Sequence, residues 1–164
     1  YAGGMCGAGW HAITSGRGQP AYLAANRAAN GTIPPAVTPQ AAQWNPAIPS
    51  SGNYRVEAWI PAHGSVEWQC PPATLPSDTA SARYTVQHAQ GEQITVTNQA
   101  AASGGWLLLG VYPFQSGSPV TVTLDTGTDE SPATRTVAAS ALRLTRQADR
   151  QELQFLYLPH VRRR

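Results

Sequence analysis

Tryptophans beside polar side chains are the residues of this sequence whose types suit the binding of a sugar. Trp59 follows Arg55 and Glu57 at a spacing that places all three side chains on one face of a strand. Trp68 has Gln69 as its polar neighbour. Sugars stack their apolar C–H faces on exposed aromatic rings, and polar side chains beside the ring fix their orientation. The predicted glycan-binding residues are therefore Trp59, Trp68, Arg55 and Glu57, provided that the two rings are exposed.

The alternative role of a tryptophan is structural, either in the core or covering an arm of the chain. Trp44 is a third candidate for sugar binding, but for Trp44 and Trp106 the sequence context favours the structural role. For Trp59 and Trp68 both roles stay open. Exposure of these two rings in the folded chain distinguishes the alternatives.

The types and spacing of the other reactive residues do not favour catalysis. The histidines are scattered, and neither a Gly-x-Ser-x-Gly elbow nor a phosphate-binding loop occurs. Glu57 and Glu67 have the residue types of a glycosidase pair, but one falls in an expected strand and the other in an expected loop, so nothing fixes their separation. We expect no enzyme activity and no cofactor.

The two cysteines, Cys6 and Cys70, are predicted to form a disulfide. An even pair in a chain that otherwise looks secreted favours a bridge, which would fasten the N-terminal arm to the body. Two unrelated buried thiols are the alternative. No Cys-x-x-Cys or His-x-x-x-His spacing supplies the other ligands of a metal site, so none is expected.

The stretch Asp125–Glu130 contains three carboxylates in six residues. It lacks the terminal glutamate and the full oxygen set of a calcium loop. A solvated acidic turn is therefore favoured over a calcium site, and the sequence leaves the choice open.

Composition excludes several classes of protein. Of the 164 residues, 12% are charged, and the net charge of +2 is too small to attract a polyanion at long range, so we expect no nucleic-acid partner. No apolar run of about 18 residues exists, so no membrane-spanning segment is expected. The chain begins at Tyr1 without a methionine, as a processed secretory protein or a fragment would.

Alternating apolar residues predict strands as the elements that position these side chains. The stretch 104–112 is apolar on both faces and predicts a core strand, which would form a hairpin with the alternating stretch 120–124. A strand over 54–60 and a hairpin over 82–98 follow from the same alternation. The remaining expectations are a long loop over 62–80, pinned by Cys70, and a last body strand over 137–144.

The ends of the chain differ from this body. Residues 1–43 form a Pro/Ala/Gly-rich arm with one expected strand at 9–14 and one or two helical turns at 22–30. Residues 147–164 hold an apolar strand that needs cover and a partner, within the chain or in a neighbouring copy, followed by an arginine tail. The predicted assembly residues are Leu153, Phe155, Tyr157 and Leu158.

Five blocks between about residues 40 and 146 resemble a known family in their order and spacing. They are Trp44–Pro49, Gly52–Val56, Ala82–Val86, Val96–Gln99, and Gly105–Trp106 with Leu109–Gly110 and Phe114; Cys6–His11 is a candidate opening strand. The family is the golvesin C-terminal-like module, also described as the carbohydrate-binding-like domain of xanthan lyases. The resemblance implies an all-β fold, an antiparallel β-sandwich of jelly-roll type over residues 44–146, and no catalytic mechanism. Members often carry an acidic residue where this chain has Ala139–Arg143, so any role of that acid is not carried over.

Two functions outside catalysis follow from the sequence. The first is a structural subunit of a bacterial cell-surface filament or layer, whose partners are copies of itself bound through the terminal segments. The second is an extracellular carbohydrate-binding module that recognises a polysaccharide through exposed tryptophans. The sequence favours the first slightly, because its apolar C-terminal strand needs a partner.

Overall fold

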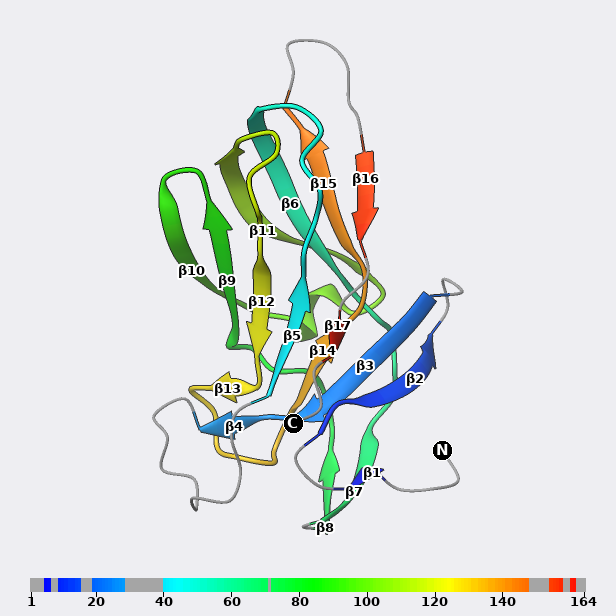
Figure 1. The fold of residues 1–164 in the computed structure, drawn as a ribbon. Coiled ribbons are helices and arrows are strands. Elements are labelled where there is room, and N and C mark those ends of the chain that lie inside the picture. The colour runs from blue at the N-terminus through cyan, green and yellow to red at the C-terminus, as the bar shows by residue number, and fades with distance from the viewer. Residues whose placement is uncertain are drawn as a thin grey trace.

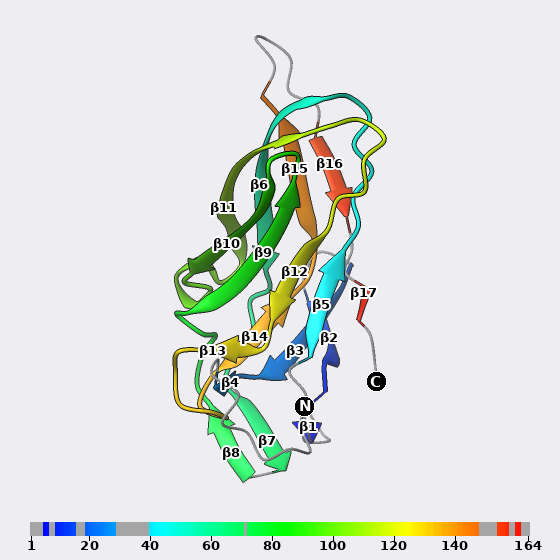
Figure 2. The same cartoon turned by 60° about the vertical axis from the view of Figure 1, so that its left-hand side comes forward.

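The computed structural model describes residues 5–6, 9–15, 19–28, 40–70, 72–147, 154–157 and 160–161; the side chains of residues 6, 15, 19, 70, 154–156 and 160–161 lie outside the description. The regular structure of these residues is strand, apart from one 3-10 helix at Ala100–Ala102. Two larger sheets pack face to face above three small ones (Figures 1 and 2). The predicted all-β sandwich is confirmed, and its jelly-roll type stays a prediction. None of the described helices has the length and apolar character needed to cross a membrane.

The front sheet in Figure 1 has five strands in the order β10-β9-β12-β5-β17, each antiparallel to its neighbour. The predicted hairpin over 82–98 is confirmed, since β9 and β10 pair from Gly91 opposite His88 to Thr97 opposite Ala82. The strands are β5 (Ala41–Trp44), β9 (Ala82–His88), β10 (Gly91–Thr97), β12 (Val122–Asp125) and β17 (His160–Val161).

The rear sheet has four antiparallel strands in the order β11-β6-β15-β16. The strand predicted at 54–60 is confirmed, but the hairpin predicted over 104–124 is wrong, because β11 belongs to this sheet and β12 to the front sheet. Alternation identifies a strand but not its partner. The strands are β6 (Gly52–Ile60), β11 (Gly105–Phe114), β15 (Leu142–Arg146) and β16 (Gln154–Tyr157).

The three small sheets lie below the sandwich in Figure 1 and correct the predictions for two segments. The helical turns predicted at 22–30 are wrong, because the alanine-rich stretch forms β3, which pairs with β2 and β14. The loop predicted at 62–80 contains the hairpin β7–β8. The strands are β1 (Met5–Cys6), β2 (His11–Ser15), β3 (Gln19–Ala25), β4 (Arg27–Ala28), β7 (Val66–Cys70), β8 (Pro72–Leu75), β13 (Gly127–Thr128) and β14 (Thr136–Ala139).

The core fills the space between the two larger sheets, where inward side chains alternate along each strand, and it continues among the small sheets through residues such as Trp10, Leu23 and Trp68. Trp44 of β5 is fully buried, stacks on Tyr84 with ring centroids 6.4 Å apart, and donates its Nε1–H to the Ser140 carbonyl at 2.9 Å. The structural role predicted for Trp44 is confirmed. The last body strand, predicted at 137–144, is divided at Ser140: β14 joins a small sheet and β15 joins the rear sheet.

The backbone brings the two cysteines together. Strand β1 pairs with β7 in parallel, and Cys6 lies opposite Cys70 in the register. Neighbouring strands lie about 4.8 Å apart, which is within the range of Cα separations that a disulfide bridges. Both side chains lie outside the description, so the disulfide stays a prediction.

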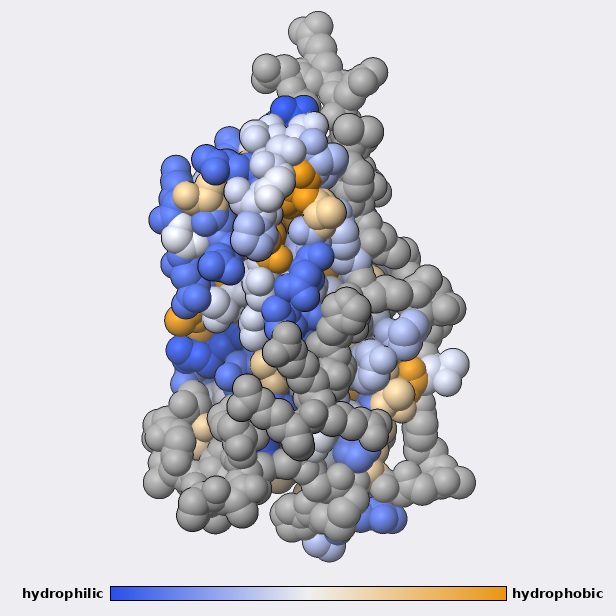
Figure 3. Space-filling model, viewed as in Figure 1, coloured by the Kyte–Doolittle hydropathy of each residue, from blue (hydrophilic) through white to orange (hydrophobic). Residues whose placement is uncertain are grey.

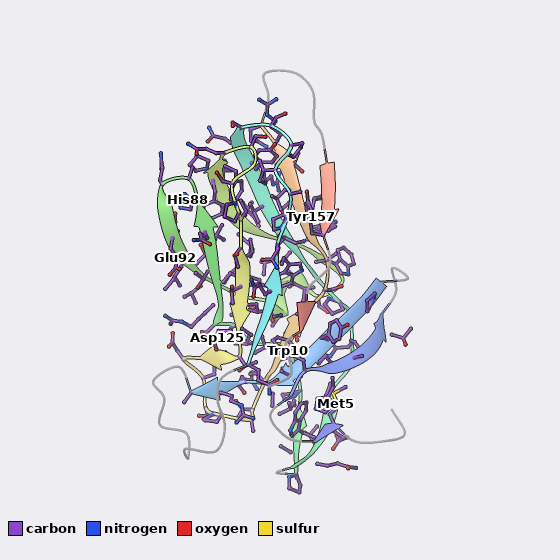
Figure 4. All side chains as sticks on the ribbon, in the orientation of Figure 1. Met5, Trp10, His88, Glu92, Asp125 and Tyr157 are labelled. Atoms are coloured by element: carbon purple, nitrogen blue, oxygen red, sulfur yellow. The ribbon has the colours of Figure 1, made fainter. Side chains whose placement is uncertain are left out.

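The C-terminal segment pairs with both larger sheets of its own chain. Strand β16 adds to β15, and β17 adds to β5. The Tyr157 hydroxyl, labelled in Figure 4, donates to the Ala47 carbonyl at 2.6 Å. Of the predicted assembly residues, Leu153, Leu158 and the side chain of Phe155 lie outside the description, while the Phe155 backbone pairs with Leu144.

Candidate functional site

The outward face of β6 carries three of the predicted site residues. Tyr54, Val56, Ala58 and Ile60 are buried between the sheets, so the alternate residues Arg55, Glu57 and Trp59 lie on the outer side of the rear sheet. The prediction that these three share a face is confirmed. Trp59 is half-buried, and the Arg55 side chain is 48% exposed.

Strand β11 brings a second tryptophan to this face. Trp106 lies opposite Trp59 in the antiparallel register, and Leu108 lies opposite Glu57. A bulge between Leu108 and Gly110 then shifts the parity, so that Val111 also points outward, opposite Arg55. Leu108 and Val111 are 49% and 55% exposed. The expectation that this strand is buried on both faces is therefore wrong, because its outer face is open beyond the tryptophans.

A buried carboxylate organises the polar part of the face. Glu57 is 3% exposed, and its Oε1 lies 2.9 Å from Nη2 of Arg55. Its Oε2 accepts hydrogen bonds from Nε and Nη2 of Arg143 on β15, at 2.9 and 2.7 Å. A buried carboxylate without a partner is costly because its charge is uncompensated. Glu57 has two guanidinium partners, so each of its oxygens is paired. Glu57 fixes the positions of both arginines.

The Arg143 guanidinium also joins the ion pairs to the aromatic rings. Its central carbon lies 4.2 Å from the centre of the Trp106 ring, within the range of a cation–π interaction. Trp106 and Trp59 meet edge to face with ring centroids 5.4 Å apart. We call this surface the tryptophan face, and its residues are Arg55, Glu57, Trp59, Trp106, Leu108, Val111 and Arg143.

The opposite surface of the sandwich is different in character. Figure 3 shows the outer side of the front sheet, and this side is largely hydrophilic. Its strands present residues such as Gln43, Thr85 and Thr123, which alternate with buried apolar residues. Ile94 and Val96 of β10 are its exposed large apolar residues among those described. Among the described residues, an outer sheet surface that combines tryptophans with ion-paired side chains occurs on the rear sheet and not on the front sheet.

Trp68 does not belong to the tryptophan face, and its prediction as a sugar-stacking residue is wrong. Its exposure is 3%: β1 pairs alongside β7 with Met5 next to Trp68 in the register, and the His11 ring meets the indole edge to face at 5.0 Å. Met5 and Trp10, labelled in Figure 4, are buried in this lower part of the molecule. The N-terminal arm therefore uses Trp68 as core.

Sequence reasoning missed two members of the tryptophan face, Trp106 and Arg143. Trp106 was given a structural role, in the core or covering an arm, but it is half-buried beside Trp59. Parity could not reveal this, because Trp106 and Leu108 alternate with the equally apolar Leu107 and Leu109; the pairing opposite Trp59 places the ring on the outer face. Arg143 had no local signal, since only the pairing of β15 with β6 places it opposite Glu57.

A pocket of about 230 Å³ lies between β2, β3 and the segment that enters β7, and it contains groups that resemble hydrolytic residues. Its lining includes His63, Ser65 and Glu67. His63 has no nitrogen available to Ser65, because Nε2 lies 2.9 Å from Oδ1 of Asp78 and Nδ1 lies 2.7 Å from the Gly64 carbonyl. Glu67 lies on β7 and Glu57 on β6, and these strands belong to different sheets. No common sheet face therefore brings the two carboxylates together as a glycosidase pair.

The His63 contacts predict a pH-dependent stability. Both ring nitrogens face acceptor oxygens, an arrangement that favours the doubly protonated ring. Burial lowers the pKa of His63, but the hydrogen bond and charge of Asp78 and the Gly64 carbonyl outweigh it and raise the pKa above 6.5. A group with a raised folded-state pKa stabilises fully below its unfolded pKa, and this contribution is lost as the pH rises through the folded value.

We therefore expect the difference in unfolding free energy between the native chain and His63→Gln to be largest below about pH 6.5 and to shrink above it. Urea unfolding between pH 5 and pH 9 measures this difference. The matched control is His88→Gln, since His88, labelled in Figure 4, ends β9 and its Nδ1 accepts from the Gln90 amide at 3.3 Å. A difference that stays constant or grows with pH would contradict the assignment.

The carboxylates of the acidic turn have separate partners. Asp125 accepts from the Gly127 amide, Asp129 lies 3.7 Å from Arg83, and Glu130 accepts from Thr79 and the Ala80 amide. Among the described residues, no group of three or more His, Cys, Asp or Glu side chains is placed to hold a metal ion. Each carboxylate of this turn is thus engaged by a hydrogen bond or an ion pair within the chain.

Comparison with known proteins identifies a family. The Golvesin C-terminal domain model matches residues 7–146, which include every strand from β2 to β15. The comparisons with curated proteins and with solved structures find no match. The matched range is most of the chain and contains the tryptophan face. The chain is therefore a member of the Golvesin C-terminal domain family.

Proposed function

We propose that this chain is a non-catalytic, extracellular module that binds a polysaccharide through the tryptophan face. The observation that carries the proposal is the Trp59–Trp106 pair, which is half-buried on an outer sheet surface beside Arg143. Aromatic rings of this kind stack on the apolar faces of sugars, and polar groups next to them orient the ligand.

The surroundings of the pair support this role. Leu108 and Val111 extend the apolar surface along β11, and Arg55 extends the polar surface along β6. An exposed apolar strip bordered by charged groups is typical of interaction sites. The network around Glu57 holds the arginines in fixed positions, which lowers the entropy lost on binding.

Family membership favours an extracellular, bacterial cell-surface location. A Cys6–Cys70 disulfide, which the register of β1 and β7 would allow, belongs with this location because disulfides persist in oxidising compartments. Mass spectrometry of the intact secreted chain, before and after alkylation of free thiols, tests the bridge. Alkylation of both cysteines without reduction would contradict it.

Substitution of the tryptophans tests the binding function. We expect Trp59→Ala and Trp106→Ala each to weaken binding to a polysaccharide by at least about tenfold, as loss of one aromatic contact of about 1.4 kcal/mol does. Affinity electrophoresis against a panel of immobilised polysaccharides, followed by calorimetry on the best ligand, provides the measurement. Ile94→Ala is the control, because Ile94 is 53% exposed on the front sheet. Binding that survives both tryptophan substitutions would refute the proposal.

A second candidate function is self-association through the terminal segments. It is favoured by the C-terminal strands, which lie beyond residue 146, where the family match ends, and which add to both larger sheets. The same strands in a neighbouring copy would extend a filament or layer. We place this function second, because pairing within the chain supplies the partner that the apolar strand needs.

Light scattering on the full chain and on a chain truncated after Gln147 tests the second function. A polymeric full chain and a monomeric truncated chain would support assembly through the C-terminal strands. Two folded monomers would contradict it.

A further inference from the structure

The polar groups that the tryptophan face offers to a ligand are hydrogen-bond donors. Glu57 is the carboxylate of the face, but both of its oxygens are already paired, Oε1 with Arg55 and Oε2 with Arg143. It is also 3% exposed, so it is not available to accept bonds from sugar hydroxyls. The exposed polar groups that remain are the guanidinium groups of Arg55 and Arg143, whose side chains are 48% and 23% exposed.

This arrangement also gives the face a positive charge. Two guanidinium groups and one carboxylate leave one net positive charge, carried on the outside by the arginines. A guanidinium group has donors and no acceptor, and its planar fork matches a carboxylate. A neutral sugar presents hydroxyls that need acceptors as well as donors, whereas an acidic sugar presents acceptor oxygens alone at its carboxylate.

We infer that the ligand of the tryptophan face is an acidic polysaccharide, whose uronate carboxylates pair with Arg55 while its sugar rings pack on Trp59 and Trp106. This inference rests on the proposed function and specifies its ligand class. Arg55 and Trp59 are four residues apart on one strand, a span of about 13 Å. The face is thus longer than a single sugar ring, and a polymer that carries repeated carboxylates occupies it better than a monosaccharide does.

Polygalacturonate and its methyl-esterified form test the inference, because they share a backbone and differ in charge. We expect the native chain to bind polygalacturonate at least about tenfold more tightly than the ester in calorimetry at low salt, and the preference to fall as the salt concentration rises. Arg55→Gln should weaken binding to polygalacturonate by about tenfold or more and leave binding to the ester unchanged. Arg55→Lys keeps the charge but loses the planar fork, so its affinity for polygalacturonate should lie between those of the native chain and of Arg55→Gln.

Arg83→Gln is the matched control, because it removes the same charge from the front sheet, where Arg83 lies near Asp129. Dextran sulfate and dextran form a second pair that tests whether any polyanion suffices. Equal binding of polygalacturonate and its ester would overturn the acidic-ligand inference and leave the proposed function standing. Tight binding of dextran sulfate that Arg55→Gln and Arg83→Gln weaken alike would also overturn it. A folded chain that binds neither form of polygalacturonate would overturn the inference, and a folded chain that binds no polysaccharide of the immobilised panel would contradict the proposed function.

Discussion

Replacing Asn26 with alanine is expected to lower the free energy of unfolding by about 3–4 kcal/mol. Asn26 is 1% exposed, and its amide nitrogen donates to the Thr128 hydroxyl and the Ser131 carbonyl, each at 2.9 Å. Its side-chain oxygen accepts the backbone amides of Thr134 and Arg135 at 3.0 and 2.9 Å. The alanine would remove all of these bonds and leave buried polar groups without partners.

Asn45→Ala is the matched control for Asn26→Ala, since Asn45 is exposed and its side-chain oxygen accepts from Gln43 at 2.9 Å. We expect it to change the unfolding free energy by less than about 1 kcal/mol. Urea unfolding of the two variants and the native chain, with the slope on denaturant compared, gives the values. A loss below about 1 kcal/mol for Asn26→Ala would show that the turn after β12 does not depend on this amide.

Gly110→Ala is expected to cost about 2–4 kcal/mol and to disturb the tryptophan face. A Cβ atom at Gly110, whose φ is 152°, would lie 2.6 Å from the Tyr112 hydroxyl oxygen and 2.7 Å from the nearest ring carbon. Tyr112 is 2% exposed, donates its hydroxyl proton to the Leu109 carbonyl at 2.8 Å, and lies 2.9 Å from the Thr95 hydroxyl. The ring would have to move, and these bonds would be lost.

Gly64→Ala is the matched control, because a Cβ atom at Gly64 meets no atom within 4 Å. It should stay within about 0.5 kcal/mol of the native stability. Near-ultraviolet circular dichroism of the Gly110 variant reports on the tryptophans, and we expect its spectrum to change because the bulge sets which side chains of β11 face outward. A Gly110 variant with native stability and a native spectrum would contradict the role given to the bulge.

The parts of the fold that sequence predicted are those in which side chains alternate against a single core. The alternation over 54–60 predicted β6 and the shared face of Arg55, Glu57 and Trp59, because one side of that strand is buried. The hairpin β9–β10 was found for the same reason, with Gly91 at its turn. In these segments the local pattern and the tertiary environment agree.

The features that the sequence analysis missed depend on contacts between residues that are distant in sequence. The stretch 22–30 is rich in alanine and favours helix locally, but Leu23, Ala24 and Ala25 are buried in β3 between β2 and β14, so tertiary pairing overrode propensity. Trp68 has the polar neighbours of a binding residue, yet it is buried where Met5 and His11, more than 55 positions away, pack beside it. Arg143 reaches the tryptophan face only through the register of β15 with β6.

The most direct test of the account follows the indole N–H signals of the tryptophans by nuclear magnetic resonance while polygalacturonate fragments are added. The sequence holds five tryptophans, so each gives one signal that single Trp→Phe variants assign. We predict that the signals of Trp59 and Trp106 shift with saturation, while those of the buried Trp10, Trp44 and Trp68 stay unchanged. Shifts confined to the buried tryptophans, or no shifts at saturating fragment, would contradict the claim that the tryptophan face binds the polysaccharide.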